Sequence, residues 1–438
     1  MQYYKSFTTE ALELSQTLPE EESELYKRHF VPIPLQKFAD RLSDAEAEDE
    51  DPVHAEISYA LLKNFAARFD AVIGSTTHAV TSRDKPIRVV NLDELDEEHL
   101  NGKLYTNRDH RLVAFIHAHS KRLVYINVPD GQKVDMNLLF VNTDNPLVTQ
   151  VLVSLGREAK LNLFEWYASR TGPQPRSQSL MSVLHEVTVG PYAMADIGMV
   201  HNEDERTYVV NFSKGKVHES GNLKMNHVYN GGLCTRAKND IDTVGYAATT
   251  NLIELVLGAQ QQKFDLNTTI SNMAQNTVAG LESKAALMDS AACILKGFAN
   301  VGEAARGSRS YVNERGILLD KTAYMSSIPG MSINNANVKA THSSATAPME
   351  EELLFYLMSR GTDKITATKM LVAGFLSGSL AKMENPVLKQ AVSSLIAEKI
   401  NTRRFGDVPK LDVSSIWAEH HEQAADLFGG HYKYRELK

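Results

Sequence analysis

The sequence is poor in cysteine: its 438 residues include only Cys234 and Cys293. Two thiols cannot form a disulfide framework, so we expect a reducing compartment and take the cytoplasm as the location. Metal clusters usually need four cysteines, or two cysteines with two histidines. Isolated cysteines with unrelated neighbours are more often small buried hydrophobic residues, so we expect no stably held metal or cluster.

The sequence also lacks a basic excess and a long apolar run. It has 46 Lys and Arg against 54 Asp and Glu, a net charge of −8. Phosphate binding needs basic patches, so we expect no nucleic-acid partner. No apolar stretch approaches the ~20 residues of a membrane span, and the first residues lack the basic-then-apolar order of a secretory signal. We therefore expect no membrane association.

Common catalytic motifs are absent as well. The sequence contains no phosphate-binding P-loop, GxSxG elbow, HExxH pair or CxxC pair. A strand would place His117 and His119 on one face, as at the start of a metal site. No third ligand lies nearby, so we interpret the pair as polar residues at a domain boundary. The sequence thus predicts a protein that is not an enzyme.

The first hundred residues are predicted to be mainly helical. Thr8 to Leu18 is a short helix candidate, and Glu56 to Phe69 is a stronger one, with apolar residues at every fourth position. The acidic run from Ser43 to Asp51 is interpreted as a solvated linker. Residues 1–103 are therefore expected to form an N-terminal helical domain.

Short β-rich pieces alternate with turn residues from about Leu104 to Val338. Examples are RLVYINVPDG, SVLHEVTVG and TNLIELVLG, each of strand length and rich in Val, Leu and Ile. Their spacing of roughly twenty to thirty residues is typical of solenoid coils, and no helical segment is predicted between them. Composition alone is compatible with three folds: a β-sandwich, a β-barrel and a β-helix.

The last ninety residues are predicted to be helical again. Pro348 is expected at the first helical position and Gly361 just after the last one. A second helix is predicted to start at Asp363, and Asn385 with Pro386 forms a cap-and-first-residue pair that opens a third.

The segment from Pro329 to Phe375 resembles the signature of the SufB/SufD family, which serves SUF iron–sulfur cluster assembly. The sequence PGMSINNANVKATHSSATAPMEEELLFYLMSRGTDKITATKMLVAGF matches the end of that family's β-helix and the following helices without a gap. The chain is identified as a SufD-like member. The resemblance implies a mainly β protein: a right-handed parallel β-helix core (104–345) between the N-terminal helical domain (1–103) and a C-terminal helical domain (346–438).

The departures from the family pattern concern its cluster-assembly positions. His342 is kept, as a cluster-assembly or interface candidate. Ala340 stands where SufD types have cysteine, Ser343 where SufB types have glutamate, and Glu314 at about the position of a cluster-building cysteine. Thiolates are the usual ligands of the iron in iron–sulfur clusters, so a cluster is expected only transiently and through a partner. A simple surface role for His342 stays open.

The resemblance implies a non-catalytic scaffold that pairs through its β-helix with a SufB-like protein, with a second copy, or with both. It also implies recruitment of a SufC-like ATPase, the subunit that binds ATP, through the C-terminal helices. Apolar residues that recur at helical spacing usually belong to the core. Only some of the apolar residues on these helices are therefore expected to form the groove that binds the ATPase. The SufC-binding candidates are Phe355, Tyr356, Arg360, Leu371 and Phe375.

Two alternatives remain. A homodimeric ATPase-binding protein without a cluster-building role is compatible with the missing thiols. A β-helix carbohydrate-active enzyme is less favoured, because it would require secretion and carboxylates clustered along one coil face, and the sequence has neither.

Overall fold

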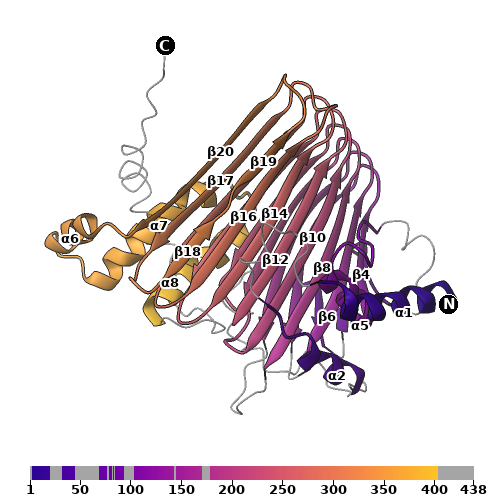
Figure 1. The fold of residues 1–438 in the computed structure, drawn as a ribbon, viewed down its shortest axis with the longest axis horizontal. Coiled ribbons are helices and arrows are strands. Elements are labelled where there is room, and N and C mark those ends of the chain that lie inside the picture. The colour runs from indigo at the N-terminus through magenta and orange to yellow at the C-terminus, as the bar shows by residue number, and fades with distance from the viewer. Residues whose placement is uncertain are drawn as a thin grey trace.

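The computed structural model describes residues 2–19, 32–44, 69–75, 78–80, 82, 84–92, 103–142, 145–169 and 178–402. These residues form a solenoid of two long β-sheets with helices on the outer faces (Figure 1). Sheet A contains, in spatial order, β2 (His78–Val80), β1 (Ala71–Gly74), β5 (Lys133–Asn142), β7 (Lys160–Ser169), β9 (Met194–Asn202), β11 (Asn222–Tyr229), β13 (Thr249–Gly258), β15 (Val278–Leu287), β17 (Arg309–Leu318) and β20 (Lys339–Pro348). Sheet B contains β18 (Tyr324–Ser327), β16 (Ala292–Val301), β14 (Lys263–Asn272), β12 (Cys234–Thr243), β10 (Thr207–Val217), β8 (Ser179–Val189), β6 (Leu147–Leu155), β4 (Arg122–Val128) and β3 (Ile87–Asn91), with β19 (Gly330–Ile333) paired to β16.

The coils of the solenoid stack in parallel and in register. The chain alternates between the two sheets, and neighbouring strands within each sheet are parallel except at the N-terminal end. Because side chains alternate across a strand, every second residue points inward and lies above its counterpart in the next coil. One such column is made of Met136, Leu163, Ile197, Met225, Leu252, Leu281 and Val312, all buried in the solenoid core. The predicted parallel β-helix is thereby confirmed, and the sandwich and barrel are excluded.

The two ends of the solenoid differ. At the N-terminal end, β2 lies antiparallel on β1 and β3 lies antiparallel on β4. At the C-terminal end, β20 pairs with β17 on one side and has no neighbouring strand on its other side within the described part of the chain. One end is closed by antiparallel strands, and the other presents an open edge.

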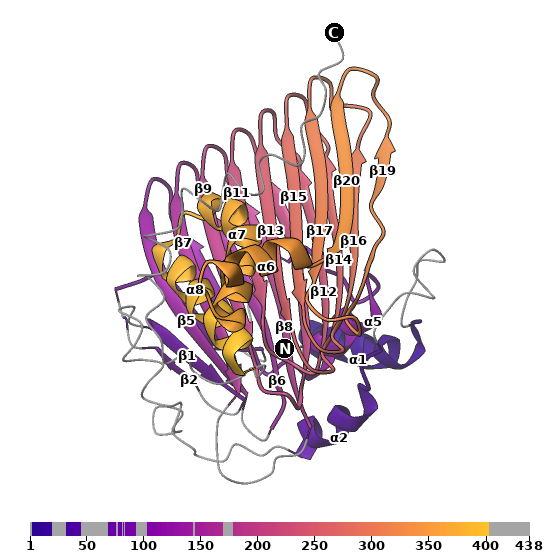
Figure 2. The same cartoon turned by 90° about the vertical axis from the view of Figure 1, so that its left-hand side faces the viewer.

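Helices pack on part of the outer face of each sheet. The described N-terminal helices lie at the N-terminal end of sheet B (Figure 1), where Phe38 and Phe115 pack with Phe212. The described C-terminal helices lie along sheet A (Figure 2), where Val372 and Leu395 pack with the outward residues of the strands. Their bounds are α1 (Gln2–Thr17), α2 (Gln36–Asp44), α5 (Arg111–His119), α6 (Glu351–Ser359), α7 (Lys364–Lys382) and α8 (Pro386–Thr402).

Local capping signals predicted the last two helices well. The Asp363 carboxylate accepts from the N–H groups of Ile365 and Thr366, both at 3.0 Å, and caps α7. The Asn385 side chain accepts from Val387 N–H at 2.9 Å at the start of α8. Each cap satisfies N–H groups that have no partner within the helix. The predicted starts at 363 and 385–386 are therefore confirmed.

Expectations about local structure were incomplete in places, and some fall outside the described residues. Among the described residues of the first hundred, the helices α1 and α2 occur together with three short strands, β1, β2 and β3, which were not expected. The helix α5 interrupts the span predicted to be β-coils only. The predicted helix from Glu56 to Phe69 lies outside the described residues except for Phe69, and most of the acidic run 43–51 does as well.

The predicted helix start at Pro348 was also wrong. Pro348 is the last residue of β20, and α6 begins at Glu351. The N–H groups of Lys339 and Met349 donate to the carbonyls of Ser308, just before β17, and of Leu318, at its end. By the two-residue period of a strand, the position of Pro348 therefore faces the open edge. Proline is tolerated there because no ladder hydrogen bond needs its missing N–H.

Candidate functional site

His342 lies at the open end of the solenoid, on the edge strand β20. It pairs in register with Val312 of β17, which is a core residue, so His342 continues an inward-facing column but is exposed. Ala340 lies above Ser310 in the same row of inward positions. The neighbouring outward residue Ser343 donates its hydroxyl to Asn313 Oδ1 at 2.9 Å. The last coil thus presents an imidazole where earlier coils present aliphatic side chains.

Glu314 is buried one coil below this end and is linked to the surface by two hydroxyls. The Ser327 hydroxyl donates to its carboxylate, and the Ser344 hydroxyl donates to Ser327 Oγ at 2.7 Å. Burial raises the pKa of Glu314 to about 7; the charge of Glu254 also raises this pKa, and the Ser327 hydrogen bond lowers it. Where the family resemblance expects a thiol, the chain has a carboxyl group that titrates near neutrality.

We expect the stability of the protein to fall as pH rises through the titration of Glu314. Its folded pKa is about 7 and its ordinary value 4.5, so the folded state keeps the proton that the unfolded state loses first. The contribution of this proton to the free energy of unfolding is about 3 kcal/mol. It is fully present below pH 4.5 and is lost by about pH 8. The free energy of unfolding of Glu314→Gln relative to wild type should therefore rise by that amount between pH 4 and pH 8, measured by urea titration. A constant difference across this range would contradict the assignment.

The two cysteines do not form a site with these groups. Cys234 begins β12 and Cys293 is buried in β16, with β14 between their strands. Burial raises the pKa of both thiols, which disfavours the thiolate that binds metal. Throughout the described ranges, no three or more His, Cys, Asp and Glu side chains are grouped so that they could hold a metal ion.

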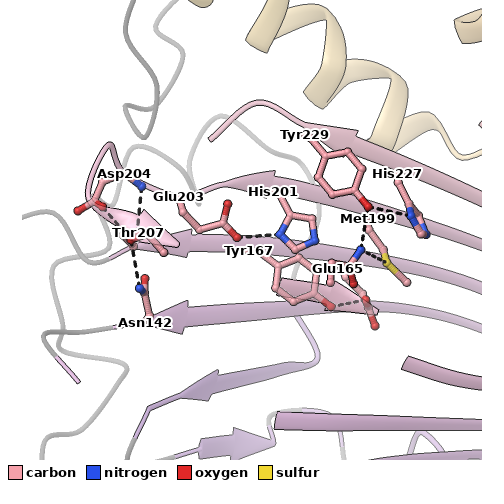
Figure 3. A network of polar contacts seen from close by, with 12 residues as sticks. Asn142, Glu165, Tyr167, Met199, His201, Glu203, Asp204, Thr207, His227 and Tyr229 are labelled. Carbon is pink, nitrogen blue, oxygen red and sulfur yellow. Dashed lines mark hydrogen bonds and ion pairs between the residues drawn. The ribbon is translucent and has the colours of Figure 1, made fainter. Parts of the chain in front are cut away.

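The interior of the solenoid contains a buried polar network that sequence reasoning missed (Figure 3). The Glu165 carboxylate lies 2.9 Å from His185 Nε2, and the Tyr167 hydroxyl donates to the same carboxylate oxygen at 2.7 Å. One coil further on, His201 Nδ1 lies 2.7 Å from Glu203 Oε1. The side chains of both His–Glu pairs are completely buried. Such groups are stable in a core only when they are paired.

Aromatic rings connect these polar groups along the solenoid axis. Tyr167 stacks on His201 with ring centroids 4.3 Å apart, and His201 stacks on Tyr229 at 5.3 Å. The Tyr229 hydroxyl accepts from Asn211 Nδ2 at 3.0 Å and lies 3.2 Å from His227 Nδ1. Burial, together with smaller contributions from the charges of His201 and His185, lowers the pKa of His227 to about 3. His227 is therefore neutral in the folded protein.

The SufC-binding candidates fall into two groups. Phe355 is 73% exposed and Tyr356 49% exposed on α6, and the Arg360 guanidinium lies 5.1 Å from the Tyr356 ring centroid. By contrast, Leu371 is buried against Leu354. Phe375 is half-buried and packs on the outer core of sheet A. Sequence analysis missed Met358 and Ile365, which are also exposed at this end of the helical layer.

His117 and His119 do not form a metal site, and the predicted strand was wrong. Both residues lie on α5, where positions two apart do not face each other. His117 is buried with Nδ1 2.8 Å from Asn107 Oδ1. His119 Nδ1 lies 2.9 Å from the Phe115 carbonyl, and its ring stacks on Phe115. The interpretation as structural polar residues agrees with these contacts.

A search of the described helices for one long and apolar enough to cross a membrane finds no candidate.

Comparison with known proteins gives one consistent result. A family model described as "SUF system FeS cluster assembly, SufBD core domain" matches residues 139–375, more than half of the chain. Proteins of Staphylococcus epidermidis and Staphylococcus haemolyticus, each described as an iron–sulfur cluster assembly SufBD family protein, are 27% identical over 256 residues. A Staphylococcus aureus protein with the same description is 25% identical. Each match covers 58% of this chain, and the chain spans about half, 54%, of each of these relatives.

Proposed function

The chain belongs to the SufBD family of SUF iron–sulfur cluster assembly proteins, and we propose that it is a non-catalytic, cytoplasmic scaffold subunit of that system. In this role it pairs through its solenoid with a SufB-like protein or with a second copy, and it recruits a SufC-like ATPase that alone binds ATP. The observation that carries the proposal is the match of residues 139–375, which covers the solenoid from β5 to β20 and reaches into α7.

Pairing through the open end is supported by the geometry of β20. The N–H groups of Lys339 and Met349 point to β17, so those of Ala340, His342, Ser344 and Thr346 point to the open edge. A long edge strand with outward N–H and C=O groups is a template for another strand. In a paired solenoid His342 would lie in the interface, close to the buried Glu314.

Docking of the ATPase on α6 is supported by its exposed apolar surface. Phe355, Tyr356, Met358 and Ile365 lie on α6 or at the start of α7. Aromatic residues and arginine are the side chains that most often contribute strongly to binding at interfaces. Leu371 and Phe375 pack the helices against each other and against sheet A. They affect docking by positioning α6 and not by contacting the ATPase.

A second role, ATPase binding by a homodimer without cluster building, is favoured by the chemistry at the open end. Glu314, Ala340 and Ser343 occupy the positions where the resemblance places thiol or carboxylate groups of the assembly site. A carboxyl group and an imidazole are hard or borderline ligands, which can bind an iron ion but lack the soft thiolate sulfur that usually holds iron–sulfur clusters. In the scaffold role a cluster is held only through the partner, and in the second role the chain takes no part in cluster building.

Purification of the tagged chain from its native cells tests the scaffold role. We expect a SufC-like ATPase to co-purify, together with a SufB-like protein or a second copy of the chain. The isolated chain, supplied anaerobically with iron and sulfide, should show no cluster absorbance after desalting. Recovery of the chain without any SUF protein, or a stoichiometric cluster on the isolated chain, would contradict the proposal.

A further inference from the structure

A chain of hydrogen bonds at the open end of the solenoid connects a buried carboxyl group to the edge strand. The carboxylate of Glu314 on β17 is buried, and it accepts from the hydroxyl of Ser327 on β18. Ser327 Oγ accepts in turn from the hydroxyl of Ser344 at 2.7 Å. Ser344 is exposed on β20 and pairs in register with Glu314. The two hydroxyls therefore link the interior of the last coil to the edge on which a partner strand would dock.

The other titratable groups around Glu314 come from the neighbouring strands. Glu314 pairs in register with Ser283 of β15, whose hydroxyl donates to the buried Glu254 carboxylate at 2.6 Å. Burial raises the pKa of the Cys293 thiol on β16, and the charges of both carboxylates contribute. His342 is exposed on β20. The inward positions of the described strands β15 to β20 hold no lysine or arginine, so no fixed positive charge there stabilises the ionised form of Glu314.

The protonation state of Glu314 decides in which direction these hydroxyls can donate. An ionised carboxylate only accepts hydrogen bonds, so Ser327 donates to it, Ser344 donates to Ser327, and the hydroxyl hydrogen of Ser344 is turned inward. A protonated carboxyl group can also donate, and each hydroxyl can then turn its hydrogen outward. In that state Ser344 can donate to an acceptor on a docked strand. The proton of Glu314 thus sets the hydrogen-bonding capacity of the open edge.

Docking of a partner also removes Glu314 further from water. Burial disfavours the ionised form of a carboxyl group, and burial, together with the charge of Glu254, already raises the pKa of Glu314 to about 7 in the chain alone. We propose that pairing through β20 is coupled to proton uptake by Glu314, so that the chain pairs with this carboxyl group protonated and separates as the group ionises. The inference rests on the pairing proposed above and adds its regulation by pH.

The direction of the effect follows from the linkage between pairing and protonation. Docking raises the pKa of Glu314 above its value of about 7 in the free chain, so pairing is strongest below that pH and weakens as pH rises above it. We expect the dissociation constant to increase about tenfold between about pH 6 and about pH 9, the factor by which docking tightens proton binding. A charge on His342 acts in the opposite sense, because burial of the imidazole disfavours its charged form.

Analytical ultracentrifugation at these two pH values, of the chain alone and mixed with a SufB-like protein, tests the coupling. Glu314→Gln should pair about equally at both, because an amide does not ionise and can donate to Ser327; it also keeps His342. Ser344→Ala removes the outer hydroxyl and should show a smaller difference between the two pH values than wild type. Glu352→Gln removes an exposed carboxylate from α6 and, as the control, should keep the wild-type pH dependence.

Calorimetry of the wild-type chain gives a second readout that needs no variant. The heat of pairing at about pH 8, compared in two buffers with different ionisation enthalpies, measures the protons that are taken up, and we expect net uptake. Pairing without net uptake, or the same pH dependence in wild type and Glu314→Gln, would overturn the inference and leave the pairing itself intact. Absence of pairing by both chains at both pH values would overturn the inference together with the pairing on which it rests.

Discussion

His185→Ala is expected to destabilise the protein by about 3–5 kcal/mol, because it leaves the buried Glu165 carboxyl without its imidazole partner. Both side chains are fully buried and their polar atoms lie 2.9 Å apart. The remaining hydrogen bond from Tyr167 cannot replace that contact, and the substitution also leaves a cavity. The free energy of unfolding from urea titration measures the effect.

Two further variants test whether the effect of His185→Ala comes from the burial of the Glu165–His185 pair. Arg108→Ala breaks an exposed ion pair with Glu10 and should have a much smaller effect, because solvent screens such a pair. The double variant Glu165→Leu with His185→Leu should recover much of the loss, because Leu138 and Val151 occupy the equivalent positions of the preceding coil. A loss below about 1 kcal/mol for His185→Ala would show that the interior pair has little structural importance.

Thr346→Pro is expected to weaken pairing through β20 without unfolding the solenoid. The N–H groups of every second residue of β20 point to the open edge, and Thr346 is one of these residues. Proline at this position therefore removes a hydrogen bond to the partner and none to β17. An acceptor left unpaired costs about 2 kcal/mol, or about thirtyfold in the dissociation constant. In a symmetric dimer the substitution acts twice, and the expected effect is about a thousandfold.

Analytical ultracentrifugation of the chain, alone and mixed with a SufB-like protein, measures that dissociation constant. Thr346→Val is the control, because it keeps the N–H group and removes only the hydroxyl. If the folded Thr346→Pro variant associates as tightly as Thr346→Val, the interface does not run along β20.

The parts of the fold that could be predicted are those specified by local signals. Asp363 and Asn385 cap the helices that they were expected to cap, and Gly361 has the positive φ of 93° expected after a helix end. The helix α5 carries no such signal, because its N-cap is His110, whose ring accepts from the Leu112 N–H at 2.9 Å. Histidine is not among the usual capping residues, so its start could not be recognised.

The site was harder to predict because it depends on which coils stack. His-x-Glu and His-x-Tyr pairs occur at His201, Glu203, His227 and Tyr229, but only the register of the strands shows that they face inward and toward one another. The pattern of apolar residues on the C-terminal helices also does not show that Phe355 is exposed and Leu371 is buried, because both residues lie at helical spacing. Burial against sheet A decides that question.

Binding of a SufC-like ATPase to α6 tests the central claim most directly. Calorimetry with the wild-type chain should show a stable complex, and Phe355→Ala should weaken it by about 2 kcal/mol or more while the melting temperature holds, because this ring is 73% exposed. Tyr324→Ala, which removes an exposed aromatic ring from β18, should bind like wild type. No binding by the wild-type chain, or full binding by a variant with Phe355, Tyr356 and Arg360 all changed to alanine, would contradict the account.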